Sequence, residues 1–225
     1  MDDTLGKQLE QRVSFALSSS LVTLAQHGNS TAESYRALRT HIMAQHVKEG
    51  RRALAICSAT SGVGATSVAS NLAVALSQIG VSTLLIDINL RNPQLDQFFQ
   101  PEAPVAGLQQ CLSSADEDFE DFIQPDILPN LSIMFAGGLP SNPQELLAGD
   151  RFDEMMRYCQ RQYDMTIVDT PPASGSSDVH RISTVVGYSL IVARRDKTLV
   201  SDIHTLSHQL KSDGARVIGT VMTEV

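Results

Sequence analysis

The stretch Ala53-Leu-Ala-Ile-Cys-Ser-Ala-Thr-Ser-Gly-Val-Gly-Ala-Thr-Ser-Val-Ala-Ser-Asn-Leu-Ala73 decides the fold. An apolar run is followed by a turn rich in Gly, Ser and Thr, and then by a helix that opens at Thr66 and Ser67. This order matches the phosphate-binding loop G-x-x-x-x-G-K-[ST], in which backbone N–H groups and a helix N-terminus hold phosphate oxygens. We therefore predict a site for ATP or ADP with Mg²⁺. Its cofactor-binding residues are Gly62, Val63, Gly64, Ala65, Thr66 and Ser67.

Two residues depart from that motif, since Ala65 stands where the lysine belongs and Ala59 stands at the first glycine. The lysine supplies a point charge at the β- and γ-phosphates, where charge develops during transfer. Losing one charged donor costs about 1.5–3 kcal/mol in binding and on the order of 10²–10³ in rate. The sequence therefore predicts a nucleotide site that is weak or lost, without efficient phosphoryl transfer. A substitute cation from Arg51, Arg52 or Arg91 is the alternative.

The composition limits the class of protein. A chain of 225 residues, 42% hydrophobic and 19% charged, is typical of a globular α/β domain with a substantial core. A formal net charge of −8, without a run of Lys and Arg, argues against nucleic-acid binding. Three widely spaced cysteines without a C-x-x-C pair are typical of a reducing cytosol. The acidic start Met1-Asp2-Asp3 does not fit a secretory signal.

Apolar strands and amphipathic helices alternate after Gly50, which predicts a three-layer α/β P-loop NTPase-like fold with a mostly parallel central sheet. The predicted strands are 53–57, 83–88, 131–136, 165–169, 189–193 and 217–222. The predicted helices are 66–79, 143–147, 151–162, 178–186 and 199–212, preceded by a helix that starts at the capping box 30–33. We divide the chain into a partly flexible N-terminal extension, 1–29, and a P-loop domain, 30–225. Within the extension, 13–24 carries a weak helical signal.

Two predicted strands each end in an aspartate, Asp87 and Asp169. A carboxylate at the carboxyl end of a strand beside the P-loop can bind Mg²⁺ directly or through water. We therefore predict Thr66, Asp87 and Asp169 as metal ligands, and the two aspartates as catalytic residues if the protein is active. For each aspartate taken alone, a helix cap or a solvated loop is the alternative interpretation.

These motifs, taken together, resemble the cytoplasmic domain of bacterial tyrosine autokinases of the capsular and exopolysaccharide family, which are relatives of the MinD/ParA P-loop ATPases. Residues 58–73 resemble that family's Walker A loop and following helix. Residues 84–93 resemble its Walker A′ motif, I-D-x-D-x-R-x-P, and 165–172 its Walker B motif, I-I-D-T-P-P. The segment 138–147 resembles its G-x-x-P-x-N-P-x-E-L-L stretch. The resemblance covers the chain from about Ser30 to its end.

Glu33, Arg36 and Arg39 recur every three residues on the first predicted helix. They match the E-x-x-R-x-x-R helix through which those kinases pack into rings, so the resemblance implies oligomerisation through these three residues, as a homo-oligomer. The helix by itself favours a simpler interpretation, because an acidic residue ahead of arginines on one face is a favourable solvated pairing.

The chain also departs from the family's pattern. Asn89 replaces the second aspartate of Walker A′, and Thr60 stands where MinD/ParA proteins place a signature lysine. We expect the tyrosine-rich tail that those kinases phosphorylate to be missing after the last predicted strand. Four scattered tyrosines are expected to pack within the fold: Tyr35, Tyr158, Tyr163 and Tyr188.

The resemblance implies a tyrosine-autokinase-like protein of exopolysaccharide synthesis and export that is weak or inactive in catalysis. It would dock, in the cytoplasm at the inner face of the plasma membrane, on a membrane polysaccharide co-polymerase, the chain-length regulator. One alternative is an active ATP-dependent protein-tyrosine kinase or ATPase with a substitute cation. A second is a MinD/ParA-type positioning ATPase, which Thr60 and the Glu33/Arg36/Arg39 helix speak against.

Overall fold

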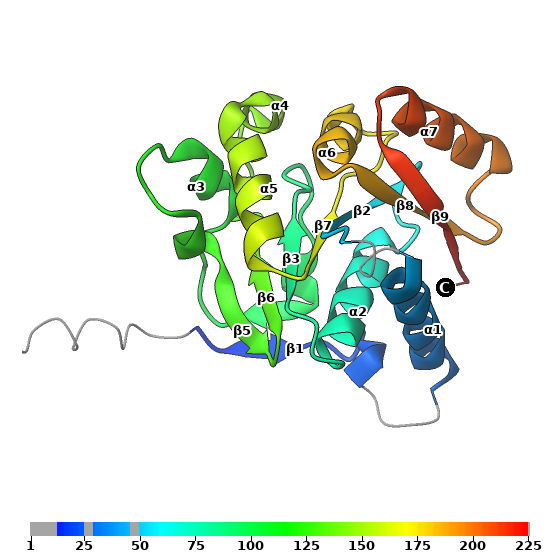
Figure 1. The fold of residues 1–225 in the computed structure, drawn as a ribbon, viewed down its shortest axis with the longest axis horizontal. Coiled ribbons are helices and arrows are strands. Elements are labelled where there is room, and N and C mark those ends of the chain that lie inside the picture. Colours follow the sequence, from blue (N-terminus) through cyan, green and yellow to red (C-terminus); the bar gives the residue numbers. More distant parts are fainter. Residues whose placement is uncertain (1–12, 25–28, 46–49, 225) are drawn as a thin grey trace, which may run out of the picture.

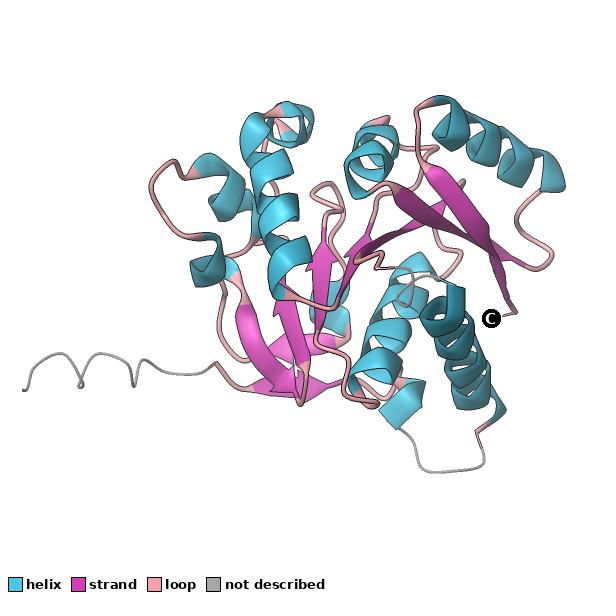
Figure 2. Ribbon diagram, viewed as in Figure 1, coloured by secondary structure: helices cyan, strands magenta, loops and turns pink. Residues whose placement is uncertain are grey.

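A seven-stranded sheet, whose inner strands are buried on both faces, runs through the middle of the molecule (Figures 1 and 2). The computed structural model describes residues 13–24, 29–45 and 50–224. The strands of the sheet are β2 (Ala53–Ser58), β3 (Thr83–Asp87), β5 (Gln124–Leu128), β6 (Leu131–Met134), β7 (Met165–Asp169), β8 (Tyr188–Arg194) and β9 (Arg216–Thr223). Their order is β5-β6-β3-β7-β2-β8-β9, and only β5 runs antiparallel to its neighbour. The predicted fold class is confirmed.

Helices cover both faces of the sheet. They are α1 (Ser30–Gln45), α2 (Ala65–Ser77), α3 (Leu108–Ser113), α4 (Pro143–Ala148), α5 (Asp150–Gln162), α6 (Asp178–Val186) and α7 (Val200–Ser212). The first two share a core cluster with one face of the sheet, and the other five share a second cluster with the opposite face. Figure 1 shows α1 and α2 side by side, away from α5, α6 and α7.

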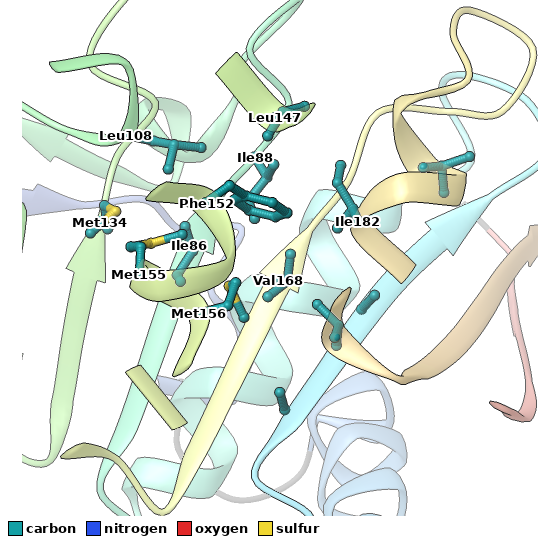
Figure 3. Close-up of a cluster of buried hydrophobic side chains, with 14 of the residues drawn as sticks. Ile86, Ile88, Leu108, Met134, Leu147, Phe152, Met155, Met156, Val168 and Ile182 are labelled. Atoms are coloured by element: carbon teal, nitrogen blue, oxygen red, sulfur yellow. The ribbon is translucent and has the colours of Figure 1, made fainter. Parts of the chain in front are cut away.

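The strand pleat divides the core between the two layers of helices. In β2, Leu54 and Ile56 face the α1/α2 layer, whereas Ala53, Ala55 and Cys57 face the other layer, because successive side chains point to opposite faces. Figure 3 shows the second cluster, in which side chains of α5 gather over the sheet. The four tyrosines are each partly buried against one of these clusters, as expected.

The weak helical prediction for 13–24 is wrong. These residues form strand β1 (Phe15–Leu17), which pairs with β4 (Phe99–Pro101), and a short 3-10 turn, Val22–Leu24. Extended backbone lets the Phe15 ring stack on Phe135 at a centroid distance of 5.9 Å. The Thr23 backbone N–H then donates to Asn71 Oδ1 at 3.2 Å. The predicted extension, 1–29, remains a prediction as a unit, because 1–12 and 25–28 lie outside the described residues.

Candidate functional site

The loop between β2 and α2 has the backbone form that phosphate binding needs. Gly62 and Gly64 have φ angles of 68° and 87°, in the left-handed region that glycine adopts without a steric penalty. The helix begins at Ala65, and the Gly64 cap offers no side-chain hydrogen bond to its first turn. The first N–H groups of a helix lack intrahelical partners, so this turn has free donors that suit an anion.

Asp169 joins this loop to the neighbouring strand. Thr66 Oγ1 donates to Asp169 Oδ2 at 2.7 Å, while Asp169 Oδ1 is buried and has no hydrogen-bond partner among the described residues. Burial raises the pKa of the Asp169 carboxyl well above its ordinary value, and the nearby Asp87 raises it further. A buried acceptor without a partner is costly, so Asp169 is suited to a ligand that brings positive charge.

Asp87 lies directly beside Asp169 in the register of β3 and β7, but its carboxylate binds backbone N–H groups of the turn that follows β3. Its Oδ1 accepts the Asn89 N–H at 3.0 Å, and its Oδ2 accepts the N–H groups of Gln94 and Leu95 at 3.0 and 3.1 Å. Burial raises the pKa of Asp87 to about 6, although these three bonds act in the opposite direction. Three of its roughly four acceptor positions are therefore filled by the turn that follows β3.

Asn89, which replaces the second Walker A′ aspartate, closes the same turn. Its Nδ2 donates to Asn92 O at 2.8 Å, and its Oδ1 accepts the Asn92 N–H at 3.2 Å. A neutral amide held in this way supplies no negative charge and cannot take a proton from a hydroxyl. The turn keeps its shape without the acid that the resemblance leads one to expect.

A cavity of about 570 Å³ opens above the loop. Neither Asp87 nor Asp169 lies on its wall, whereas Thr66 and Asn89, which are hydrogen-bonded to Asp169 and Asp87, both do. The wall consists of Ser58, Ser61, Gly62, Val63, Gly64, Ala65, Thr66, Ser67, Asn89, Arg91, Asn92, Gln94, Gln97, Phe98, Thr170, Pro171, Pro172, Gly175 and Arg194. All six predicted cofactor-binding residues are among them, at the carboxyl ends of the strands, where open α/β sheets bind ligands.

The substitute cations expected from the sequence are not free at this cavity. Arg51 and Arg52 precede β2, so the whole strand separates them from the loop, at about 3.3 Å per residue. Arg51 instead lies over the Tyr188 ring, 4.7 Å from its centroid. Arg91 lines the cavity, but its Nε donates to Asp178 Oδ2 at 2.8 Å.

Two cations that the sequence analysis missed lie on the loop itself. Arg194 Nη1 and Lys197 Nζ both donate to Gly62 O, at 3.3 and 3.0 Å. Arg194 is the last residue of β8 and Lys197 lies three residues beyond it; β8 pairs with β2 in parallel and ends at the same edge of the sheet. The signal that could have found them is this position, because basic residues directly after a neighbouring parallel strand reach the same edge.

The donor set fits a nucleotide phosphate with Mg²⁺. The first turn of α2 would provide N–H groups, and Thr66, with Asp169 hydrogen-bonded behind it, would provide oxygen ligands. Across 13–24, 29–45 and 50–224, no group of three His, Cys, Asp or Glu side chains could hold a metal ion. Mg²⁺ commonly relies on one or two carboxylates together with phosphate and water oxygens, which is what this site could offer.

The three predicted oligomerisation residues do not share one environment. Arg36 Nη1 pairs with Glu33 Oε2 at 2.7 Å, and the glutamate is well exposed. Arg39 turns inward, where its Nη1 donates to Ala75 O of α2 at 3.1 Å. Glu33 and Arg36 remain available for contact with another chain, whereas Arg39 also fastens α1 to α2.

A parallel α/β sheet whose strand β2 runs into a glycine loop and a helix N-terminus, beside two strand-end aspartates, defines a P-loop nucleotide-binding domain. The chain belongs to the ParA family of P-loop NTPases, since the family model described as NUBPL iron-transfer P-loop NTPase matches residues 49–223. Its homologues include bacterial tyrosine-protein kinases, such as Wzc of Salmonella typhi, with 27% identity over 207 residues and 92% of this chain. The chain spans about a quarter of the length of the first such relatives, 28% for Wzc.

Solved structures agree with this assignment. The kinase domain of the Escherichia coli tyrosine kinase ETK superposes with a TM-score of 0.84 at 29% identity, covering 97% of this chain and 84% of ETK. The cell-division ATPase MinD of Pyrococcus furiosus superposes with a TM-score of 0.65 at 22% identity, covering 76% of this chain and 71% of MinD. The second likeness shows a shared fold only. In the ranges that the structure describes, no helix is both long and apolar enough to cross a bilayer.

Proposed function

We propose that this chain is a tyrosine-autokinase-like regulator of exopolysaccharide synthesis and export that binds nucleotide weakly and has lost efficient phosphoryl transfer. The observation that carries the proposal is Ala65, a methyl group on the cavity wall at the first residue of α2. The P-loop lysine belongs at this position, and it would reach the β- and γ-phosphates.

The remaining residues support binding better than transfer. The N–H groups of the α2 N-terminus and the Thr66 hydroxyl hold phosphate and metal without taking part in proton transfer. Asp87 and Asn89 are bound to the backbone of their own turn, so neither is free to orient or deprotonate a tyrosine hydroxyl. The site has therefore lost a cation at the phosphates and an anion in the region of the expected base.

An assay for ATP turnover and phosphotyrosine tests the loss of catalysis. We expect no turnover above background for the wild type, and a gain in Ala65→Lys. Wild-type activity that Asp169→Asn abolishes would support the alternative of an active kinase or ATPase. Asp169→Asn is a sharper choice than a change at Asp87, because Asp87 also holds the turn 89–95 together.

Regulation would act through docking on a membrane polysaccharide co-polymerase at the inner face of the plasma membrane. Kinship with tyrosine-protein kinases supports this partner, and the exposed Glu33–Arg36 pair supports a homo-oligomer built through α1. A MinD/ParA-type positioning ATPase is the second alternative, since the chain shares the fold of MinD.

Light scattering and co-purification test the docking. Reversing both charges, Glu33→Arg with Arg36→Glu, is expected to alter an assembly by disturbing contacts between chains. The matched control is Glu154→Arg with Arg157→Glu, an exposed pair at the same spacing on α5. Capture of cell-division or chromosome-partition proteins in place of a co-polymerase would favour the positioning ATPase. A monomer at every concentration would contradict the homo-oligomer.

A further inference from the structure

The end of β8 and the segment that joins it to α7 place two cations on the phosphate loop. Arg194 lines the cavity and donates from Nη1 to Gly62 O, and Lys197 reaches the same oxygen from the exposed surface. The contact between Lys197 and the loop is close, because a Cβ added to Gly62 would lie 2.7 Å from Nζ. Neither residue belongs to the loop motif, and neither has a part in the function proposed above.

Hydrogen bonds hold the turn after β8 in shape and fasten the neighbouring β9 to the loop. The Arg194 N–H donates to Thr198 Oγ1 at 2.9 Å, and the Thr198 N–H returns a bond to Arg194 O at 2.9 Å. On the other side, Thr223 Oγ1 of β9 donates to Val63 O at 2.7 Å. The two cationic side chains therefore project from a turn that is held in shape beside the loop. Only these flexible side chains need to move to contact a ligand.

Their present partners make these two cations different from the others nearby. Arg91 is neutralised by Asp178 at 2.8 Å, and Arg195 pairs with Glu224 at 3.3 Å. In the described parts of the chain, Arg194 and Lys197 pair with no carboxylate. Both donate to one backbone carbonyl, which is a neutral acceptor. A phosphate oxygen would add an opposite charge to the same donors, and such ion pairs are among the stronger hydrogen bonds in proteins. A phosphate in the cavity would draw them away from Gly62 O.

We propose that Lys197, together with Arg194, supplies the positive charge to the terminal phosphates of a bound nucleotide that Ala65 cannot supply. The inference rests on the proposed function only in requiring that the loop binds nucleotide. The Lys197 ammonium is a point charge on a flexible four-carbon stem. The planar Arg194 guanidinium can donate two parallel hydrogen bonds to phosphate oxygens. The P-loop thus keeps affinity for nucleotide with a cation that comes from a neighbouring strand.

Calorimetry with Mg·ATP and Mg·ADP on the full chain tests the proposal. Lys197→Met keeps the length of the stem and is expected to weaken binding roughly tenfold, and adding Arg194→Met up to about a hundredfold, as for lost charged donors. Lys197→Arg should retain most of the affinity. Arg195→Met, a neighbouring cation paired with Glu224, is the matched control and should bind as the wild type does.

Two further measurements separate phosphate binding from a role in holding the loop. The wild-type affinity should fall more steeply with salt than that of Lys197→Met, because a screened charge pair is lost in the variant. Adding Ala65→Lys to Lys197→Met should restore binding. A variant that unfolds more easily but keeps the wild-type affinity and salt dependence would overturn the inference, because Lys197 would then only fasten the loop.

The outcomes also separate this inference from the function on which it rests. Wild-type protein that binds no nucleotide at millimolar concentration would overturn both the weak site and the assignment of its cation. Wild-type binding that the double change leaves intact would overturn the inference alone, and the regulator with a weak nucleotide site would stand.

Discussion

The loop after β2 and the turn after β3 lie at the same edge of the sheet, one strand apart, but they use their backbones in opposite ways. The loop leaves the first turn of α2 without a side-chain cap, open to an anion. In the turn, the Asp87 carboxylate accepts hydrogen bonds from three backbone N–H groups of the turn itself. Both resemble family motifs, although Ala59 and Ala65 depart from the first and Asn89 departs from the second. A segment that matches a family motif can therefore keep its shape for binding in one place and for folding in another.

Removing the Asp87 carboxylate should have the largest effect on this contrast. Asp87→Ala leaves three backbone N–H groups of the turn without their acceptor, at about 1–3 kcal/mol for each one that water cannot reach. We expect the free energy of unfolding to fall by about 3–5 kcal/mol, measured by urea denaturation.

The control for this change is Asp96→Ala, an exposed aspartate in the same segment. It should cost no more than about 0.5 kcal/mol, as surface substitutions do. If Asp87→Ala were as mild as the control but abolished nucleotide binding, Asp87 would be a metal ligand, and the two regions would both serve the ligand.

Restoring the lysine should change the affinity of the loop after β2 for nucleotide. Ala65→Lys adds a charged donor at the cavity wall and should tighten Mg·ATP binding roughly ten- to hundredfold, worth about 1.5–3 kcal/mol, by calorimetry. Ala65→Met, of similar length without charge, should give no gain. An unchanged affinity in Ala65→Lys would mean that the loop no longer receives phosphate.

Asp169 ends β7, the strand between β2 and β3. The pH dependence of stability should show whether its carboxylate is destabilised as an anion when no cation is bound. Burial and Asp87 raise its pKa, so the unfolded chain releases this proton at a lower pH than the folded one. Stability is therefore lost as the pH rises through the ordinary pKa to the folded pKa, and the loss persists above it. Asp169→Asn keeps an acceptor for Thr66 and cannot titrate.

The free energies of unfolding of wild type and Asp169→Asn, compared from pH 4 to pH 8 without Mg²⁺, check this expectation. The free energy of unfolding of the variant should rise relative to that of the wild type as the pH rises. The difference at pH 7 should be on the order of 1–3 kcal/mol, because that is a usual cost for an unsatisfied buried group. Asp116→Asn, at an exposed position, provides the surface control. A difference that shrinks with pH would show that the Asp169 carboxylate is well stabilised as an anion.

Much of this fold could be predicted from the sequence, because buried parallel strands are continuous apolar runs. The prediction for β7, 165–169, and that for α6, 178–186, agree with the structure to the residue. The edge strand β5 was missed, since Pro125 and Asp126 interrupt its pattern and Asp126 has a φ of 52°. α3 was also missed, because its six residues are too few to show a helical period.

The candidate site also contains residues that could be predicted from the sequence and residues that were missed. The loop is local in sequence, so its six residues could be predicted and all line one cavity. The cations Arg194 and Lys197 were missed, because they reach Gly62 only through the pairing of β8 with β2, and finding them needs the strand order as well as their position at the end of a strand. Nor does a pattern of letters show that Asp87 accepts three backbone N–H groups, since those bonds depend on how the following turn folds back.

The smallest expected effect isolates the contact between the loop and Lys197. Gly62 and Gly80 both have φ near 70–80°, at 68° and 83°, so Gly→Ala at either should cost about 1–2 kcal/mol of backbone strain. A Cβ at Gly80 meets nothing within 4 Å, whereas a Cβ at Gly62 meets Lys197 Nζ at 2.7 Å.

Gly62→Ala should therefore move the ammonium from Gly62 O, while Gly80→Ala leaves it in place. We expect equal losses of stability within about 0.5 kcal/mol, since the displaced atom is the end of a flexible, exposed side chain. Binding of Mg·ATP should differ between the two, with only Gly62→Ala changing the salt dependence of the affinity. Identical binding in both variants would show that the lysine is a bystander, and the loop would then hold phosphate with its backbone alone.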